Sequence, residues 1–191
     1  MSQRQLKTTV AFFIFNRPYT TEKVFAEIAK AKPPKLLVVA DGPHPDRPGE
    51  VDACATVRAI INHVDWKCEV LTNYSDVNLG CRRRVASGLN WVFDQVEEAI
   101  ILEDDCLPHP SFFRFCEELL EIYRHDERVM HIAGSNFQFG RRYGNARRLS
   151  EKKPVYQSIV AVGPMPDDNA CSLLSNLRLR NHTETNDGQA P

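Results

Sequence analysis

The sequence lacks an apolar run long enough to cross a membrane or to form the core of a signal peptide. The first apolar run, Val10–Phe15, has only six residues. The sequence also lacks an excess of charge of one sign, because 24 basic and 25 acidic residues leave a net charge of −1. No general field therefore attracts nucleic acid. We expect a cytoplasmic protein that binds no nucleic acid, and a peripheral contact with a membrane stays open.

Several catalytic and metal-binding motifs are missing as well. The six cysteines are scattered, with no CxxC pair and no histidine cluster at zinc spacing, which disfavours a structural zinc site. Without an export signal, free thiols in a reducing compartment are favoured. The sequence contains neither a GxSxG string nor a P-loop, so two common nucleophile and phosphate motifs are not indicated.

Strand and helix patterns alternate along most of the chain. The length of 191 residues suits one domain with a substantial core. Predicted strands cover residues 8–15, 35–40, 69–73, 99–102 and 129–133, and predicted helices cover residues 20–30, a segment through Val57, residues 79–93 and residues 110–124. This alternation predicts an α/β, Rossmann-like fold with a mostly parallel sheet and helices on both faces.

The alternation ends near Gly140. Residues 1–140 are therefore interpreted as one nucleotide-binding domain. Residues 141–191 are rich in basic residues at first and later in Pro, Asn, Asp and Ser. They show no convincing apolar period, which predicts a poorly ordered, atypical tail.

Three adjacent acids, Glu103, Asp104 and Asp105, follow the predicted buried strand 99–102. In parallel sheets, ligands bind in the crevice outside the carboxyl ends of the strands. Crowded carboxylates there need a neutralising charge, and hard oxygen ligands suit Mg²⁺ or Mn²⁺. The alternative is an acidic helix start, but the next helix is predicted to begin only at Pro110. The acids therefore favour a divalent metal and a phosphate-bearing substrate.

Two further residues follow strands at the same predicted edge. Asp41 comes after the strand 35–40 and could accept a hydrogen bond from a base N–H or a ribose hydroxyl; its alternative is an ordinary Asp-Gly turn. Arg17 follows the first strand and could bind a phosphate through both ends of its guanidinium group. A surface arginine beside a turn proline is an equally good interpretation of Arg17.

Arg82 and Arg83 lie with Arg84 near the start of the predicted helix 79–93. A helix N-terminus with arginines is a ready anion site. Three consecutive side chains point in different directions around a helix, so one or two of them at most can face one ligand. The alternative for these residues is a solvated basic surface.

Four strings together resemble a known family. FNRP, VVADGP, NLGCRRRVASGLNWVF and AIILEDDCLPHPSFFRFCEELLEIYRHDERVMHIAGSN resemble the nucleotide-binding half of GT-A glycosyltransferases. The match is to bacterial family-2-like transferases and extends to the N-acetylglucosaminyltransferase I type, whose metal motif is also Glu-Asp-Asp. The resemblance covers roughly residues 8–140, and EDD in its strand–helix frame is its most specific part.

The resemblance implies roles for the three acids. Asp105 would coordinate Mn²⁺ or Mg²⁺ bridging the diphosphate of a nucleotide sugar. Asp104 would hold the ribose, and Glu103 would lie beside the donor sugar or support the metal site. These acids would thus bind the donor and its metal together.

The same resemblance implies contacts for the other candidates. Asp41 would contact the nucleobase, and Arg17 would contact the base or the diphosphate region. One of Arg82 and Arg83 would approach the phosphates. The catalytic base stays unassigned.

The implied function is a metal-dependent glycosyltransferase. It would transfer a sugar from a UDP- or GDP-sugar to the hydroxyl of a glycan or lipid-linked acceptor, in polysaccharide biosynthesis. The family's aromatic-rich acceptor segment has no counterpart after residue 140, which leaves a non-catalytic nucleotide-sugar binding module as the alternative. A sugar-nucleotide nucleotidyltransferase is disfavoured because FNRPYT contains no glycine to form a phosphate-cradling loop.

Overall fold

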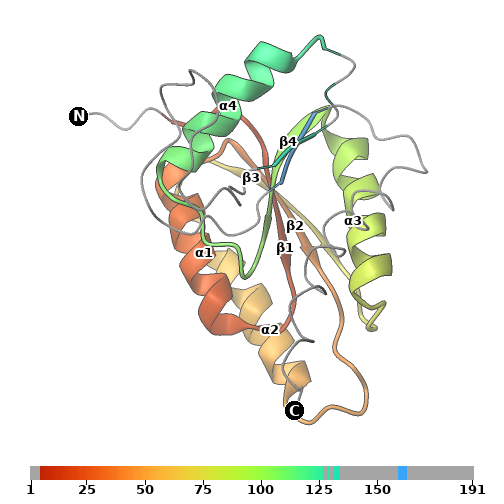
Figure 1. Ribbon diagram of the computed structural model, residues 1–191. Helices are drawn as coiled ribbons and strands as arrows, with labels where there is room; N and C mark the ends of the chain where they lie inside the picture. The colour runs from red at the N-terminus through yellow and green to blue at the C-terminus, as the bar shows by residue number, and fades with distance from the viewer. Residues whose placement is uncertain (1–4, 127–128, 130, 134–158, 163–191) are drawn as a thin grey trace, which may run out of the picture.

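The computed structural model describes residues 5–126, 129, 131–133 and 159–162. A six-stranded sheet forms its centre, with the strand order β3-β2-β1-β4-β6-β5 (Figure 1). The strands are β1 (Val10–Ile14), β2 (Lys35–Ala40), β3 (Glu69–Tyr74), β4 (Glu98–Glu103), β5 (His131–Ala133) and β6 (Ile159–Val162). Strands β1 to β4 are parallel, while β6 runs antiparallel to both β4 and β5. The predicted α/β class with a mostly parallel sheet is confirmed.

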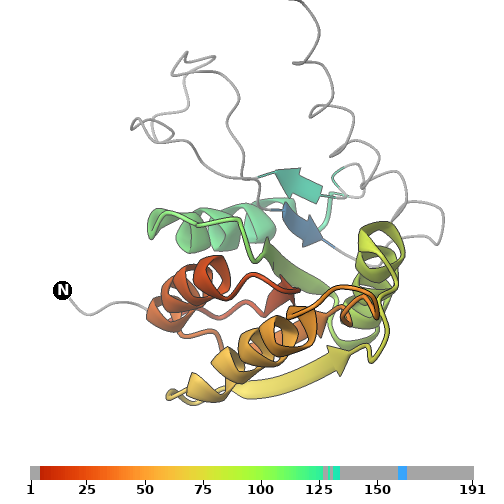
Figure 2. The same cartoon turned by 90° about the horizontal axis from the view of Figure 1, so that it is seen from below.

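Helices cover both faces of this sheet. They are α1 (Pro18–Ala31), α2 (Glu50–Ile60) with a short 3-10 turn at Ile61–His63, α3 (Cys81–Gln95) and α4 (Ser111–Tyr123). Helices α1, α2 and α4 pack on one face, and α3 packs on the other (Figure 2). Among the described residues, no helix is both long and apolar enough to span a bilayer.

Successive side chains of the central strands point to opposite faces of the sheet, and so they contribute to two hydrophobic cores. In β1, Val10, Phe12 and Ile14 face the core under α1, α2 and α4, whereas Ala11 and Phe13 face α3. All five residues of β1 are buried. A strand covered on both faces has few positions for polar side chains, which is why β1 and β2 appear in the sequence as nearly continuous apolar runs.

Strand β6 was not predicted. It lies in the segment interpreted as a tail, and it pairs with β4 from Glu98↔Val162 to Ile101↔Ile159. Its four residues are too few to show an alternation of apolar and polar side chains. Only its hydrogen bonding to β4 and β5 distinguishes it from a loop. The sheet therefore continues beyond the predicted boundary at residue 140. The remainder of the predicted tail lies outside the described residues.

The parallel register brings the carboxyl ends of four strands to one edge. Ile14 of β1 is opposite Ala40 of β2, Phe13 of β1 is opposite Glu103 of β4, and Ala40 is in turn opposite Tyr74 of β3. The chain builds β2 and β3 on one side of β1 and then places β4 on the other side. The junction of β1 and β4 is thus the topological switch point, where open α/β sheets bind their ligands.

Candidate functional site

One arginine bridges two acids at the switch point. Arg17 directly precedes α1, and its Nη2 donates to Oδ1 of Asp104 at 2.5 Å while its Nη1 donates to Oδ2 of Asp105 at 2.7 Å. The other oxygen of Asp104, Oδ2, accepts the backbone N–H of Phe15 at 3.1 Å. The ends of β1 and β4 are therefore joined by charge-assisted hydrogen bonds, which are the stronger kind in proteins.

The site holds more negative than positive charge. Burial raises the pKa of Asp104 even though Arg17 opposes the shift. Burial, and then the charges of Asp105 and Asp104, raise the pKa of Glu103. Burial disfavours the charge of Arg17, but its two carboxylate partners outweigh burial and raise its pKa. One guanidinium group thus faces three acids, and an additional cation would relieve the crowding.

The oxygens that remain available decide what kind of metal ion the site fits. Both oxygens of Asp104 are used within the chain, and its exposed fraction is only 2%. Asp105 is 43% exposed, and its Oδ1 receives only a long contact of 3.5 Å from the Cys106 thiol. In the described part of the chain, no three His, Cys, Asp or Glu side chains gather into a metal cage. The residues therefore fit an ion such as Mg²⁺, which takes one or two carboxylates and completes its shell with substrate phosphates and water.

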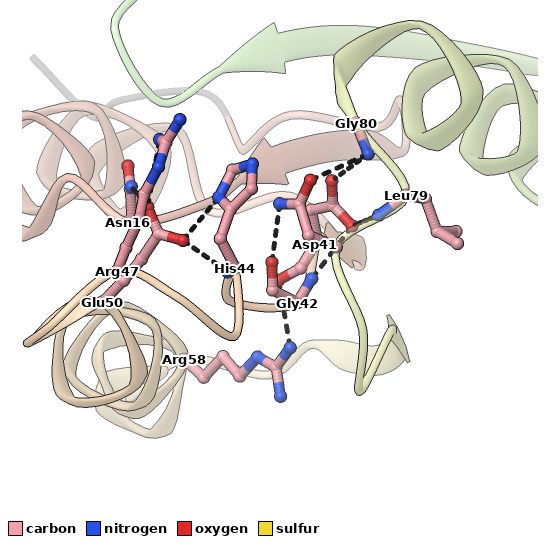
Figure 3. Close-up of polar contacts among 10 residues, drawn as sticks. Asn16, Asp41, Gly42, His44, Arg47, Glu50, Arg58, Leu79 and Gly80 are labelled. Atoms are coloured by element: carbon pink, nitrogen blue, oxygen red, sulfur yellow. Dashed lines mark hydrogen bonds and ion pairs between the residues drawn. The ribbon is translucent and has the colours of Figure 1, made fainter.

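Asp41 lies at the predicted edge, but its carboxylate faces the backbone of a neighbouring loop. Its Oδ1 accepts the N–H groups of Gly42 and Leu79, both at 2.9 Å, and its Oδ2 accepts the N–H of Gly80 at 3.1 Å (Figure 3). The exposed fraction of Asp41 is 6%. Asp41 therefore clamps the turn after β2 to the loop before α3.

Gly42 allows this clamp to close. A Cβ atom on Gly42 would lie 2.5 Å from the carbonyl carbon of Val77. The carbonyl oxygen of Gly42 also accepts the side-chain N–H of Asn78 at 2.8 Å. The close approach of the two backbones thus requires glycine at this position.

The three arginines of α3 have different environments. Arg82 and Arg83 are exposed in the first turn of the helix, whereas Arg84 is buried. Arg84 donates from Nε to the carbonyl of Ala40 at 3.1 Å and from Nη2 to Oδ1 of Asn73 at 2.7 Å. Arg84 therefore ties the ends of β2 and β3 together, and the anion-binding role of Arg82 or Arg83 stays a prediction.

Glu50 is the centre of a second cluster, which the sequence analysis missed. Its Oε1 accepts the side-chain N–H of Asn16 at 2.7 Å, and its Oε2 lies 2.6 Å from both the backbone nitrogen and Nδ1 of His44 (Figure 3). The guanidinium group of Arg47 lies 3.6 Å from Oε1. The backbone N–H of His44, together with the side chains of His44 and Asn16, lowers the pKa of Glu50 to about 2. Residues 44–50, HPDRPGE, form a polar, Pro-rich string, and such a string does not reveal these contacts.

Comparisons with known proteins leave the family open. No family model and no curated protein matches the sequence. Two solved structures of 4-diphosphocytidyl-2C-methyl-D-erythritol synthase are similar to this chain. One is 12% identical over 90% of this chain and 86% of that chain, with a TM-score of 0.43. The other, from Anaerococcus prevotii DSM 20548, is 9% identical over 95% and 80%, with a TM-score of 0.47. Likeness at this level says nothing about substrate or reaction.

Removing one acceptor from the Asp41 clamp tests its structural role. In Asp41→Asn, an amide N–H₂ group replaces one carboxylate oxygen; in place of Oδ2 it would oppose the N–H of Gly80, which would keep only its second acceptor, Oδ1 of Asn78 at 3.1 Å. We expect a loss of about 1–3 kcal/mol in the free energy of unfolding, measured by urea denaturation. Asp94→Asn, at an exposed position of α3, is the control and should change stability little. Equal stabilities of the two variants would contradict the clamp.

The low pKa of Glu50 predicts an acid-labile contribution to stability. Its pKa is 4.5 when unperturbed and about 2 in the fold, so the unfolded chain binds more protons between these values. The contribution is present above pH 4.5 and is lost as the pH falls toward 2. Glu50→Gln should therefore melt at a lower temperature than the wild type at pH 7, with a difference that shrinks toward pH 2. The exposed Glu22→Gln should show neither effect, and a constant difference across this range would refute the assignment.

Proposed function

We propose that this chain binds a nucleoside-diphospho-sugar with a divalent metal ion and acts as a GT-A type glycosyltransferase. The observation that carries the proposal is the pairing of Arg17 with Asp104 and Asp105 at the switch point. This is the position at which open α/β sheets bind ligands. It combines the guanidinium group that suits phosphates with the exposed carboxylate that suits a metal.

Each residue of this pairing would have a distinct part in donor binding. Asp105 would hold the metal ion through its half-exposed carboxylate, and Arg17, with 48% of its side chain exposed, would turn from Asp105 to the diphosphate. Asp104 would keep its bond to the Phe15 N–H and would hold the ribose by exchanging its bond to Arg17 for one to a ribose hydroxyl. The bound metal would stabilise the charge that develops on the departing nucleoside diphosphate.

Asp41, Arg82 and Arg83 would act around this centre. The clamp of Asp41 would hold the β2 turn in place beside the nucleobase. Arg82 and Arg83, exposed on the first turn of α3, would add positive charge near the phosphates. One extended anionic ligand could lie beside the Asp41 clamp and reach Arg82 and Arg83 on the first turn of α3.

A module that binds the donor without turnover is the second candidate. The buried carboxylates of Asp41, Glu50 and Asp104 all accept hydrogen bonds from within the chain. An acid committed in this way is a poor general base, because its lone pairs already face donors. If no other acid removes the proton from an acceptor hydroxyl, the chain would bind its nucleotide sugar without transferring the sugar.

The test is an assay of the full chain with UDP- or GDP-sugars and Mn²⁺. Thermal stabilisation by ligand and release of nucleoside diphosphate are measured together. We expect metal-dependent stabilisation in the wild type and at least about a tenfold loss of nucleotide affinity in Asp105→Asn, since a metal ligand is removed. Asp65→Asn, exposed and just before the amino end of β3, is the matched control and should behave as wild type.

The outcomes separate the candidates. Stabilisation with release supports the transferase, and stabilisation without release supports the binding module. In a parallel reaction that supplies a nucleoside triphosphate and a sugar phosphate, release of pyrophosphate would instead assign nucleotidyl transfer. Absence of any stabilisation by UDP- and GDP-sugars in the presence of Mn²⁺ would overturn the proposed function.

A further inference from the structure

Strand β3 forms one of the two edges of the sheet. In the described part of the chain it pairs with β2 alone, at six consecutive positions from Lys35↔Glu69 to Ala40↔Tyr74 (Figure 2). The opposite edge strand, β5, has only three residues. A short edge strand presents few unpaired backbone groups, whereas a strand of six residues presents a row of them. Strand β3 is therefore the edge at which another strand can pair.

The sequence of β3 has none of the features that commonly keep an edge strand from pairing. These features are proline, lysine, a β-bulge and an inward-pointing charge. The strand has the sequence EVLTNY, and its register with β2 is uninterrupted. Its one charged residue, Glu69, lies at its first position, where Nζ of Lys35 is 3.4 Å from the carboxylate. The edge is thus suited to the addition of a strand.

Alternate residues of β3 direct their backbone groups away from β2. The N–H groups of Glu69 and Ser75 donate to the carbonyls of Pro34 and Ala40 at 2.9 and 3.0 Å. Because every second residue of a parallel strand bonds to the same neighbour, the odd-numbered residues of β3 bond to β2. The N–H and C=O groups that point to the free edge belong to the even-numbered residues, which are Val70, Thr72 and Tyr74.

The side chains of the same three residues line a hollow of about 590 Å³ between β3 and α2. On the α2 side the hollow is bordered by the small residues Ala55 and Ala59, which leave room above the strand. The guanidinium group of Arg58 lies 4.9 Å from the centre of the Tyr74 ring and holds that ring at the end of the hollow. Directly opposite residues of antiparallel strands point to the same face. A strand added antiparallel to β3 would therefore place its own alternate side chains beside this hollow.

The strand β3 is complementary to itself when a second copy runs antiparallel, with Thr72 opposite the partner's Thr72. Val70 is then opposite the partner's Tyr74, and only this register pairs all three outward-facing residues of one strand with those of the other. Pairs of threonines, and pairs of an aromatic with a β-branched residue, stabilise antiparallel sheets. Glu69 is opposite the partner's Ser75, so no like charges meet. The free edge thus fits a second copy of the same edge.

We propose that β3 pairs antiparallel with β3 of a second copy, so that two chains form a two-fold symmetric dimer with one continuous sheet. Antiparallel pairing turns the carboxyl edges of the two sheets in opposite directions. Each copy therefore keeps its own switch-point crevice open, and neither site depends on the other chain. The inference concerns assembly and stands apart from the proposed function.

The test measures the mass of the full chain in solution by analytical ultracentrifugation over a series of protein concentrations. We expect the wild type to reach twice the mass of one chain. Thr72→Lys places two ammonium groups directly opposite each other at the two-fold axis, and we expect it to associate at least about tenfold more weakly. Asn90→Lys, at an exposed position of α3, adds the same charge on another element and should associate as the wild type does.

Amide hydrogen exchange of the wild type checks the register without any variant. On dilution from dimer to monomer, the N–H groups of Val70, Thr72 and Tyr74 should exchange at least about tenfold faster. Those of Leu71 and Asn73, which bond to β2, should keep their rates. This comparison decides the inference even if Thr72→Lys does not fold.

Three results would overturn the inference. The first is a monomer at every concentration up to about 0.1 mM. The second is a folded Thr72→Lys that associates as tightly as the wild type, since another surface would then hold the two copies together. The third is a dimer in which dilution leaves the exchange rates of Val70, Thr72 and Tyr74 unchanged.

Discussion

The pairing of Arg17 with Asp104 and Asp105 holds the carboxyl edge of the sheet together. It joins β1 to β4, the two neighbouring strands that lie furthest apart in the sequence among the parallel set. Phe15 and Asn16, which directly precede Arg17, make further contacts between the ends of the strands. The backbone N–H of Phe15 reaches Asp104, its ring packs on His44, and the amide of Asn16 reaches Glu50. Three consecutive side chains thus organise the loops that follow β2 and β4.

This arrangement explains why FNRP stands at the end of β1. Pro18 begins α1, where its missing N–H costs no hydrogen bond. Arg17 must then leave the strand toward β4, while Asn16 turns to the start of α2. The string FNRP therefore combines a helix start with contacts to the segments that follow β2 and β4, and each contact places a polar group at the carboxyl edge of the sheet.

The acids after β4 are costly to hold without a partner. The raised pKa values of Glu103 and Asp104 both arise first from burial. Arg17 supplies one compensating charge and leaves Asp105 half exposed. A divalent cation at Asp105 would compensate the remainder, and a diphosphate would in turn supply further oxygen ligands for that cation. In the proposed function, metal and nucleotide would therefore bind as one coupled event.

The sequence predicted the strands and helices of the first 126 residues well because their apolar patterns are long and regular. Strand β2 has the predicted bounds, and α3 begins within two residues of the prediction. The pairing of Arg17 with the acids was harder to predict from the sequence, because 87 positions separate Arg17 from Asp104. The sequence could place Asp41 at the edge, but an acid after a strand can face a ligand or a backbone equally well. Glu50 and His44 were missed because their contacts depend on loop conformation, which carries no apolar period.

The most direct test of coupled binding is the affinity of Mn²⁺ for the full chain, measured by electron paramagnetic resonance with and without a nucleoside diphosphate. Because the oxygens of Asp104 are committed within the chain, the few remaining carboxylate oxygens predict weak binding by the chain alone and at least about tenfold tighter binding in the ternary mixture, after correction for Mn²⁺ bound by the free nucleotide. Equal affinity in the two conditions would contradict the account, because the switch point would then hold its metal without the diphosphate.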